Sequence, residues 1–245
     1  MRKTLLIAAA ALAASVISSQ AQVYSQNIVG YVNSPVPSGY VNLSVPLDGA
    51  SGNNSITNTI NVFSGAYDGD LLNIWQGTHY AVYTIDSTVS TGIADAADIN
   101  PVTPPVVNPG TGFFLQNIGA SNNITWVGTV HVDGAGASTN VVGVTTNVVA
   151  VGNYYYASTI PVGGGVSSVL QLPNNGSLDG SLINIPNISG GSVHGFTTIT
   201  IDSTMSTGFA DAADINPVPE PTIPVGSGFF LQNITSGSVN WVQSF

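Results

Sequence analysis

One segment of this chain occurs twice almost unchanged. TIDSTVSTGIADAADINP at 84–101 returns as TIDSTMSTGFADAADINP at 200–217, with only two substitutions. The block GFFLQNI at 112–118 recurs without change at 228–234, at the same spacing of 116 residues. Long segments repeated at a fixed spacing indicate copies of one structural unit. The fold must therefore accommodate the same unit twice, and any function must account for a pair of near-identical loops.

The first residues predict export. Arg2 and Lys3 precede a short apolar run and then small residues up to Ala21, which is typical of a secretory signal peptide. That run is too short to span a bilayer, so we expect a secreted protein, extracellular or at the cell surface, without membrane insertion. We divide the chain into a signal peptide (1–21), β repeat 1 (22–130), a Gly-rich linker (131–138) and β repeat 2 (139–245).

The charge balance excludes several partners. Without residues 1–21 the chain has 12 acidic residues and no lysine or arginine. Nucleic acids and anionic membranes are bound largely through those basic residues, so we expect neither as a partner. No cysteine is present, and disulfides are therefore excluded. Each carboxylate must be solvated, accept hydrogen bonds from neutral donors, or bind a cation.

Short β-prone runs broken by Gly, Pro and Asn fill both repeats. YAVYTI at 80–85 and ITWVGTV at 124–130 are examples, and several such runs alternate apolar and polar residues as half-buried strands do. Turn residues every ten positions or so favour an antiparallel sandwich or barrel. We expect an all-β fold of two tandem homologous repeats. The Ala-rich stretch 92–99 is the one helix candidate, with a loop as the equal alternative.

The duplicated loop carries the first candidate site. Its polar residues are Asp95, Asp98 and Asn100, repeated as Asp211, Asp214 and Asn216. Oxygen-rich flexible loops are typical calcium ligands, although the spacing differs from that of an EF-hand. The alternative is that the aspartates cap turns by accepting backbone N–H bonds. Calcium is therefore an optional cofactor here, and no other cofactor is required.

The repeats also place one aspartate in each half, as a paired-aspartate hydrolase would. Asp86 and Asp202 each precede Ser-Thr, but Thr88 and Thr204 occupy the position where such enzymes have glycine. The competing interpretation is that the two carboxylates lie far apart. No nucleophile elbow accompanies the histidines. We therefore expect no catalytic residue and no enzyme, and keep an aspartic-type hydrolase only as a remote alternative.

The tryptophans give the third candidate. Trp126 and Trp241 lie in the closing strand of each repeat, where core packing is expected. Trp75 stands near Gly77 in a turn-like region, and Pro186 takes its place in repeat 2. Trp75 is therefore the candidate for stacking on a surface glycan.

Several motifs together resemble a known group of proteins. They are QNIVGYVN at 26–33, PVPEP at 217–221, GSGFFLQN at 226–233 and NWVQSF at 240–245. The combination resembles a family of duplicated secreted all-β proteins from verrucomicrobial-type bacteria, with GxGFFxQN as the most specific block. The resemblance covers nearly all of the chain after the signal peptide. It implies export and a duplicated β architecture, and it implies no activity, cofactor or site residue.

These observations predict a non-enzymatic structural or adhesive protein of the cell surface or extracellular matrix. The stretch 140–151 is β-prone and lacks charge and proline, so an exposed edge there would favour self-association. The alternative function is an extracellular carbohydrate-binding module that uses Trp75.

Overall fold

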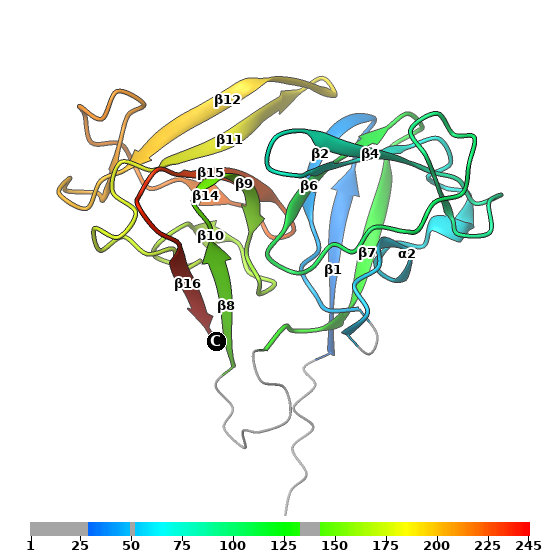
Figure 1. Cartoon of the computed structure of the whole chain (residues 1–245), viewed down its shortest axis with the longest axis horizontal. Helices are drawn as coiled ribbons and strands as arrows, with labels where there is room; N and C mark the ends of the chain where they lie inside the picture. The colour runs from blue at the N-terminus through cyan, green and yellow to red at the C-terminus, as the bar shows by residue number, and fades with distance from the viewer. Residues whose placement is uncertain (1–28, 50–51, 133–142) are drawn as a thin grey trace, which may run out of the picture.

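The computed structural model describes residues 29–49, 52–132 and 143–245 (Figure 1). It is 46% strand and 4% helix, with several antiparallel sheets and a half-barrel, so the all-β prediction is confirmed. The signal peptide at 1–21 and most of the linker at 131–138 lie outside the described residues. Within the described part, no helix is long and apolar enough to cross a membrane.

The first half forms a five-stranded sheet and a two-stranded ribbon (Figure 1). The sheet has the order β2-β6-β3-β4-β5, and the ribbon pairs β1 with β7. Two short helical turns follow β2 in the chain. The bounds are β1 Val29–Val36, β2 Gly39–Ser44, α2 Ile56–Thr59, η2 Val62–Ser64, β3 Leu71–Trp75, β4 Tyr80–Ile85, β5 Ile93–Ala94, β6 Gly112–Asn117 and β7 Asn122–Thr129.

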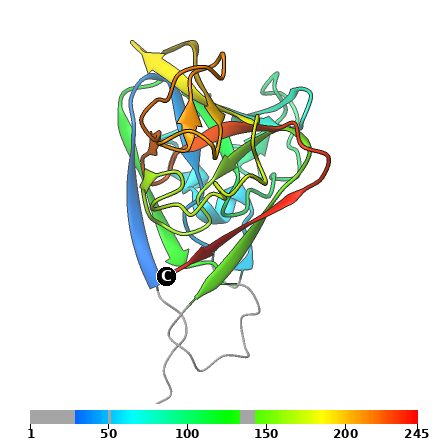
Figure 2. The same ribbon diagram turned by 90° about the vertical axis from the view of Figure 1, so that its left-hand side faces the viewer.

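The second half has a sheet of corresponding strand order, β9-β15-β11-β12-β13, and a ribbon of β8 with β16. A further short pair, β10 with β14, has no counterpart in the first half. Both ribbons run toward the same end of the molecule (Figures 1 and 2). The bounds are β8 Val144–Val149, β9 Gly152–Ala157, β10 Gly164–Gly165, β11 Leu182–Ser189, β12 Ser192–Ile201, β13 Phe209–Ala210, β14 Thr222–Ile223, β15 Gly228–Asn233 and β16 Val239–Ser244.

The Ala-rich stretch at 92–99 is not a helix. Its first residues form β5, which pairs with the end of β4, and turns follow. The loop alternative therefore holds. Pro101 forms a single bridge to Ala94, and Pro217 does the same with Ala210, as expected for proline beside an edge strand.

The GFFLQN strands are buried on both faces, which explains why they do not alternate apolar and polar residues. In β6, Phe113 and Leu115 pack into the core of the first half, whereas Phe114 points into a third cluster. Phe230 of β15 joins that same third cluster. A central strand covered on both sides reads as a continuous apolar run.

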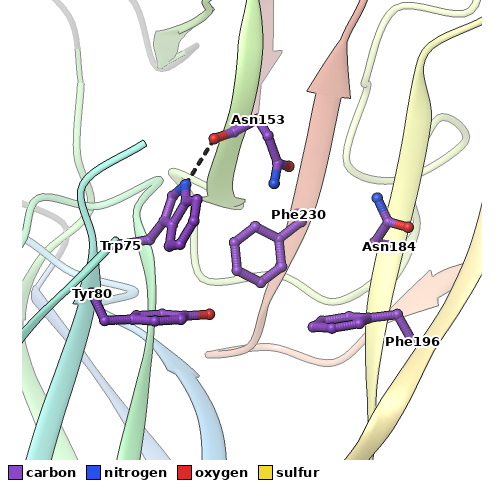
Figure 3. A pocket seen from close by; sticks show the side chains of 6 residues that line it. All are labelled: Trp75, Tyr80, Asn153, Asn184, Phe196 and Phe230. Carbon is purple, nitrogen blue, oxygen red and sulfur yellow. Dashed lines mark hydrogen bonds between the residues drawn. The ribbon is translucent and has the colours of Figure 1, made fainter. Parts of the chain in front are cut away.

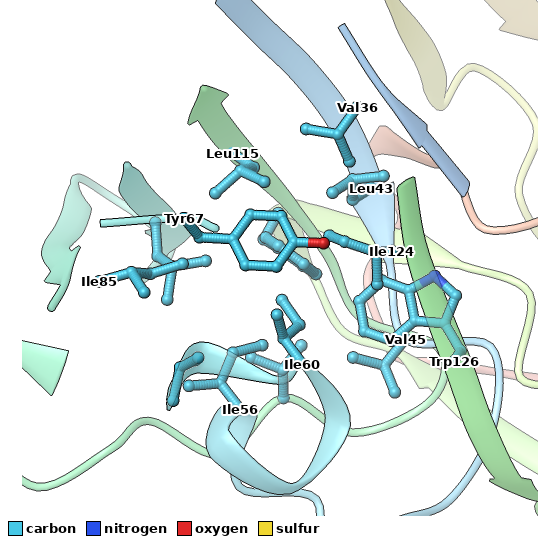
Figure 4. Packing of buried hydrophobic residues seen from close by; sticks show 14 of the residues in the cluster. Val36, Leu43, Val45, Ile56, Ile60, Tyr67, Ile85, Leu115, Ile124 and Trp126 are labelled. Carbon is cyan, nitrogen blue, oxygen red and sulfur yellow. The ribbon is translucent and has the colours of Figure 1, made fainter. Parts of the chain in front are cut away.

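Each half has its own core. In the first, Trp126 packs among residues that include Leu43, Val45 and Ile124, above the α2 turn (Figure 4). Its Nε1 donates to Ser34 Oγ at 2.9 Å. Trp241 occupies the core of the second half, and its Nε1 donates to the carbonyl of Leu170 at 2.6 Å. Both indoles are buried and hydrogen-bonded, so their predicted core role is confirmed.

The two halves pack against each other through a small aromatic cluster, Phe114, Tyr155 and Phe230. The rings of Tyr155 and Phe230 stack at 4.2 Å and 5°. Gly112 and Gly228 lie back to back there: a Cβ on Gly228 would stand 2.9 Å from the Cα of Gly112. Only glycine at these positions lets the two central strands approach this closely.

Asn42 binds both halves together. Its Nδ2 donates to the carbonyl of Gly228 at 2.6 Å, and its Oδ1 accepts from the N–H of Gly228 at 2.9 Å. The hydroxyl of buried Tyr155 donates to the same Oδ1 at 2.5 Å. A single amide therefore satisfies three polar groups at the junction, each of which would be costly to bury unpaired.

Candidate functional site

The duplicated acidic loops are closed by their own hydrogen bonds. The carboxylate of Asp95 accepts from the N–H of Ile99 at 3.0 Å and from the amide of Asn100 at 2.7 Å. In the second half, Asp211 accepts from Ile215 and Asn216 at 3.0 and 2.6 Å. The loops thus have the same geometry in both halves.

Asp98 and Asp214 sit at the tight point of these loops, with φ of 56° and 58°. Aspartate is among the few non-glycine residues that adopt this conformation readily. Both side chains are exposed. Each backbone N–H donates to the carbonyl of the loop's first aspartate at 2.9 Å.

This geometry matches the capping interpretation. The hydrogen bond from Ile99, followed by that from Asn100, lowers the pKa of Asp95, and the equivalent bonds lower that of Asp211. The Nδ2 of Asn100 donates to Asp95, so the carboxylate and the amide of each loop are paired with each other. Among the described residues no group of three or more His, Asp or Glu could hold a metal ion. Calcium binding by these loops stays a prediction.

Asp86 and Asp202 also have local partners. Asp86 Oδ1 accepts from the N–H and hydroxyl of Thr88 at 2.8 and 2.7 Å, and Asp202 accepts from Thr204 in the same way. The threonine hydroxyl, then its N–H, lowers the pKa of each aspartate. Two carboxylates that share a proton would instead have one strongly raised pKa. The geometry describes two turn caps.

Glu220 is the one glutamate of the chain, and it closes a turn as well. It accepts from the N–H groups of Ser167 and Ser168 at 2.6 and 2.7 Å and from the hydroxyl of Ser168 at 2.7 Å. Burial acts to raise the pKa of Glu220, but these three bonds together lower it.

Asp70 is the exception among the acids, and nothing in the sequence singled it out. It is 1% exposed, and its Oδ1 accepts from the N–H of Ile118 at 2.9 Å. Its Oδ2 is buried without a partner. Burial, reinforced by the charge of Asp68, raises the pKa of Asp70 to about 6. Ser181 takes this position in the second half, where its hydroxyl accepts from Ile234.

Trp75 lies at the mouth of the junction. Its indole is half-buried, and its Nε1 donates across the junction to the backbone carbonyl of Asn153 at 2.7 Å. Trp75 meets Tyr80 at 5.0 Å and Phe230 at 5.7 Å, both edge to face. The predicted surface residue is thus also a tie between the two halves.

Around Trp75 the structure forms an open groove of about 290 Å³ (Figure 3). We call it the junction groove; its lining residues are Trp75, Tyr80, Asn153, Asn184, Phe196 and Phe230. Trp75 and Tyr80 come from the first half and the other four from the second. Tyr80 and Phe196 are 116 positions apart, so they occupy the same place in the repeated unit.

No acidic or basic side chain lines the junction groove. Burial raises the pKa of Tyr80 to about 12, which keeps its hydroxyl neutral. The amide oxygen of Asn184 accepts from Thr198 at 2.7 Å, which leaves its N–H₂ for other partners. The amide oxygen of Asn153 is buried without a partner.

Of the six groove residues, only Trp75 is a candidate from the sequence. Four of them belong to the second half, and only the packing of the two halves brings them to Trp75. The sequence signal that was present is the aromatic residue shared by positions 80 and 196 of the two repeats. In comparisons with known proteins, no family model, curated protein or solved structure matches this chain.

Proposed function

We propose that this chain is a secreted, non-enzymatic structural or adhesive protein of the cell surface or extracellular matrix, and that it self-associates. Export is supported by the basic and apolar residues at 1–21. The matching strand orders of the two five-stranded sheets support two homologous repeats. The carboxylates that were candidates for catalysis act as turn caps, which supports a non-enzymatic role.

Most outer strand edges in the described residues are short, contain or border a proline, or face the other half. β5 and β13 are two residues long, and each meets a proline, Pro101 or Pro217. Short edges bordered by proline resist pairing with another chain. β2 and β9 face the opposite half, to which Ser44 and Ala157 donate backbone hydrogen bonds. β1 contains Pro35, which has no backbone N–H to donate to another strand.

β8 differs from these strands because one of its edges has no such protection, and this edge is the observation that supports self-association. In the described residues it pairs only with β16. Gly143 and Phe245 each donate a backbone hydrogen bond to the other. Because such pairs alternate along an antiparallel ladder, the backbone N–H and C=O groups of Val144 and Thr146 point away from β16. The other side of the ribbon is closed at Ser244, which exchanges hydrogen bonds with the side chain of Gln171. An uncharged, proline-free edge of this kind is a template for a second chain.

Sedimentation velocity over a range of protein concentrations tests this proposal. The side chain of Val144 is 40% exposed, so Val144→Lys should leave the core intact while placing a charge at the edge. We expect the average mass of the wild type to rise with concentration and Val144→Lys to remain monomeric. Tyr31→Lys is the matched control, because Tyr31 is 73% exposed on β1 of the other ribbon; it should associate as the wild type does. A wild type that is monomeric throughout would contradict the proposal.

A further inference from the structure

The junction groove is already formed in the folded chain. Trp75 is held by its hydrogen bond to Asn153 and by edge contacts with Tyr80 and Phe230. Phe196 meets Phe230 at 5.6 Å and 81°. Because these rings are fixed by packing and not by a ligand, binding would order few side chains, which favours affinity.

Packing between the two halves does not account for the exposed aromatic ring of Phe196 in the groove. The junction is sealed by Phe114, Tyr155 and Phe230, which are all buried. Phe196 stands outside that seal, 44% exposed on β12. In Figure 3 the rings of Tyr80 and Phe196 lie to either side of Phe230, and Asn153 and Asn184 lie across the groove from them. The groove therefore offers aromatic surface and amide groups to the same ligand.

The polar groups indicate what that ligand carries. The N–H₂ of Asn184 is left to donate hydrogen bonds, because its amide oxygen already accepts from Thr198, and Asn153 adds a second amide side chain to the lining. A ligand with hydroxyl groups suits amide side chains, since a hydroxyl both donates and accepts hydrogen bonds. An apolar ligand would cover the N–H₂ of Asn184 and leave it without a partner, which costs free energy.

The charges narrow the choice further. An anionic ligand would meet a chain whose formal net charge is −10, with no cation in the groove. A quaternary ammonium ligand suits aromatic rings, but it has no hydroxyl for the amides, and no carboxylate lines the groove to pair with it. A neutral ligand with an apolar face and a rim of hydroxyls fits both the rings and the amides. Such a ligand is a pyranose ring.

We propose that the junction groove binds a sugar ring of a neutral glycan, with an apolar face of the ring against Phe196 and Tyr80 and its hydroxyls on Asn153 and Asn184. The volume of about 290 Å³ is at the small end of ligand pockets, about 300–1,000 Å³, and suits a short stretch of a glycan. The site is separate from the β8 edge, so glycan binding and self-association can fail independently.

Affinity electrophoresis tests the proposal with soluble polysaccharides in the gel. The neutral probes are β-glucan, xyloglucan, xylan and galactomannan, and alginate is the anionic comparison. We expect at least one neutral polysaccharide to retard the wild type and alginate not to. Because Phe196 is partly exposed, Phe196→Ser should fold normally and lose about tenfold in affinity through the missing aromatic contact. Tyr31→Ser, another exposed aromatic position, should bind as the wild type does.

Tryptophan fluorescence gives a second readout on the same samples. Trp126 and Trp241 are buried in the two cores, so a spectral change on adding a neutral oligosaccharide would come mainly from Trp75. Three results would each overturn the proposal. They are no retardation by any neutral polysaccharide, equal retardation of Phe196→Ser and wild type, and a fluorescence response to tetramethylammonium without a response to the oligosaccharide. Circular dichroism of Phe196→Ser separates lost binding from lost folding.

Discussion

Replacing the buried Asp70 by asparagine should change how stability depends on pH. Asp70 lies just before β3; one of its carboxylate oxygens accepts from the N–H of Ile118 and the other has no partner. Asparagine keeps a carbonyl oxygen for Ile118 and cannot ionise. The substitution therefore removes the buried charge and conserves the shape of the side chain.

The sign and size of the effect follow from the pKa. Burial raises the pKa of Asp70 from 3.8 to about 6 in the folded chain. The protonated form thus contributes stability that is fully present below pH 3.8 and is lost as the pH rises through about 6. At about 1.36 kcal/mol per pKa unit, the loss is at most about 3 kcal/mol.

Other carboxylates act in a different pH window. Asp86, Asp95, Asp202 and Asp211 have lowered pKa values, so they contribute stability above the unfolded pKa of 3.8 that is lost only as the pH falls through their folded values. Between about pH 4.5 and 7.5 the difference between wild type and Asp70→Asn therefore reports Asp70 almost alone.

Urea unfolding at pH 4.5, 5.5, 6.5 and 7.5, followed by tryptophan fluorescence, measures this difference. We expect Asp70→Asn to gain about 2 kcal/mol relative to wild type between the lowest and highest pH, as its partial titration at pH 4.5 allows. Asp98→Asn, which removes an exposed carboxylate, is the matched control and should show no such trend. A stability difference for Asp70→Asn that stays constant across this range would refute the buried-charge argument.

Three further predictions concern the junction, the acidic loops and export. Gly228→Ala should separate the halves, because its Cβ would stand 2.9 Å from both the Cα of Gly112 and the carbonyl oxygen of Tyr156; small-angle scattering should then report a longer particle, and an unchanged profile would contradict the packing. If the acidic loops bind calcium, added calcium should raise the melting temperature of the wild type but not of Asp95→Ala/Asp211→Ala, whereas pure capping predicts a loss of stability that is the same with and without calcium. The exported protein should begin at Gln22 by mass spectrometry and resist trypsin, and tryptic fragments would contradict the signal-peptide assignment.

The strands and cores follow from local pattern. The place of Trp126 and Trp241 in the closing strand of each repeat predicts their burial, and the short β-prone runs predict the strands. The turn aspartates also behave as capping rules expect. These strands, core residues and turns depend on residues close together in the sequence, and both repeats contain those residues.

The junction could not be predicted in the same way. Asn42 and Tyr155 meet although they are far apart in sequence, and neither belongs to the identical blocks. Asp70 differs from its counterpart Ser181, and its raised pKa depends on burial that no local pattern reveals. Trp75 was identified by its turn-like surroundings, but its contact with the second half depends on how the two sheets pack.

The proposed self-association depends on the edge of β8 that faces away from β16. Hydrogen–deuterium exchange at low and high protein concentration tests it directly, residue by residue. We expect the amides of Val144 and Thr146, which point away from β16, to exchange more slowly at high concentration, while those of β1 are unchanged. Exchange of the β8 amides that is independent of concentration, or protection that appears on β1 instead, would contradict it.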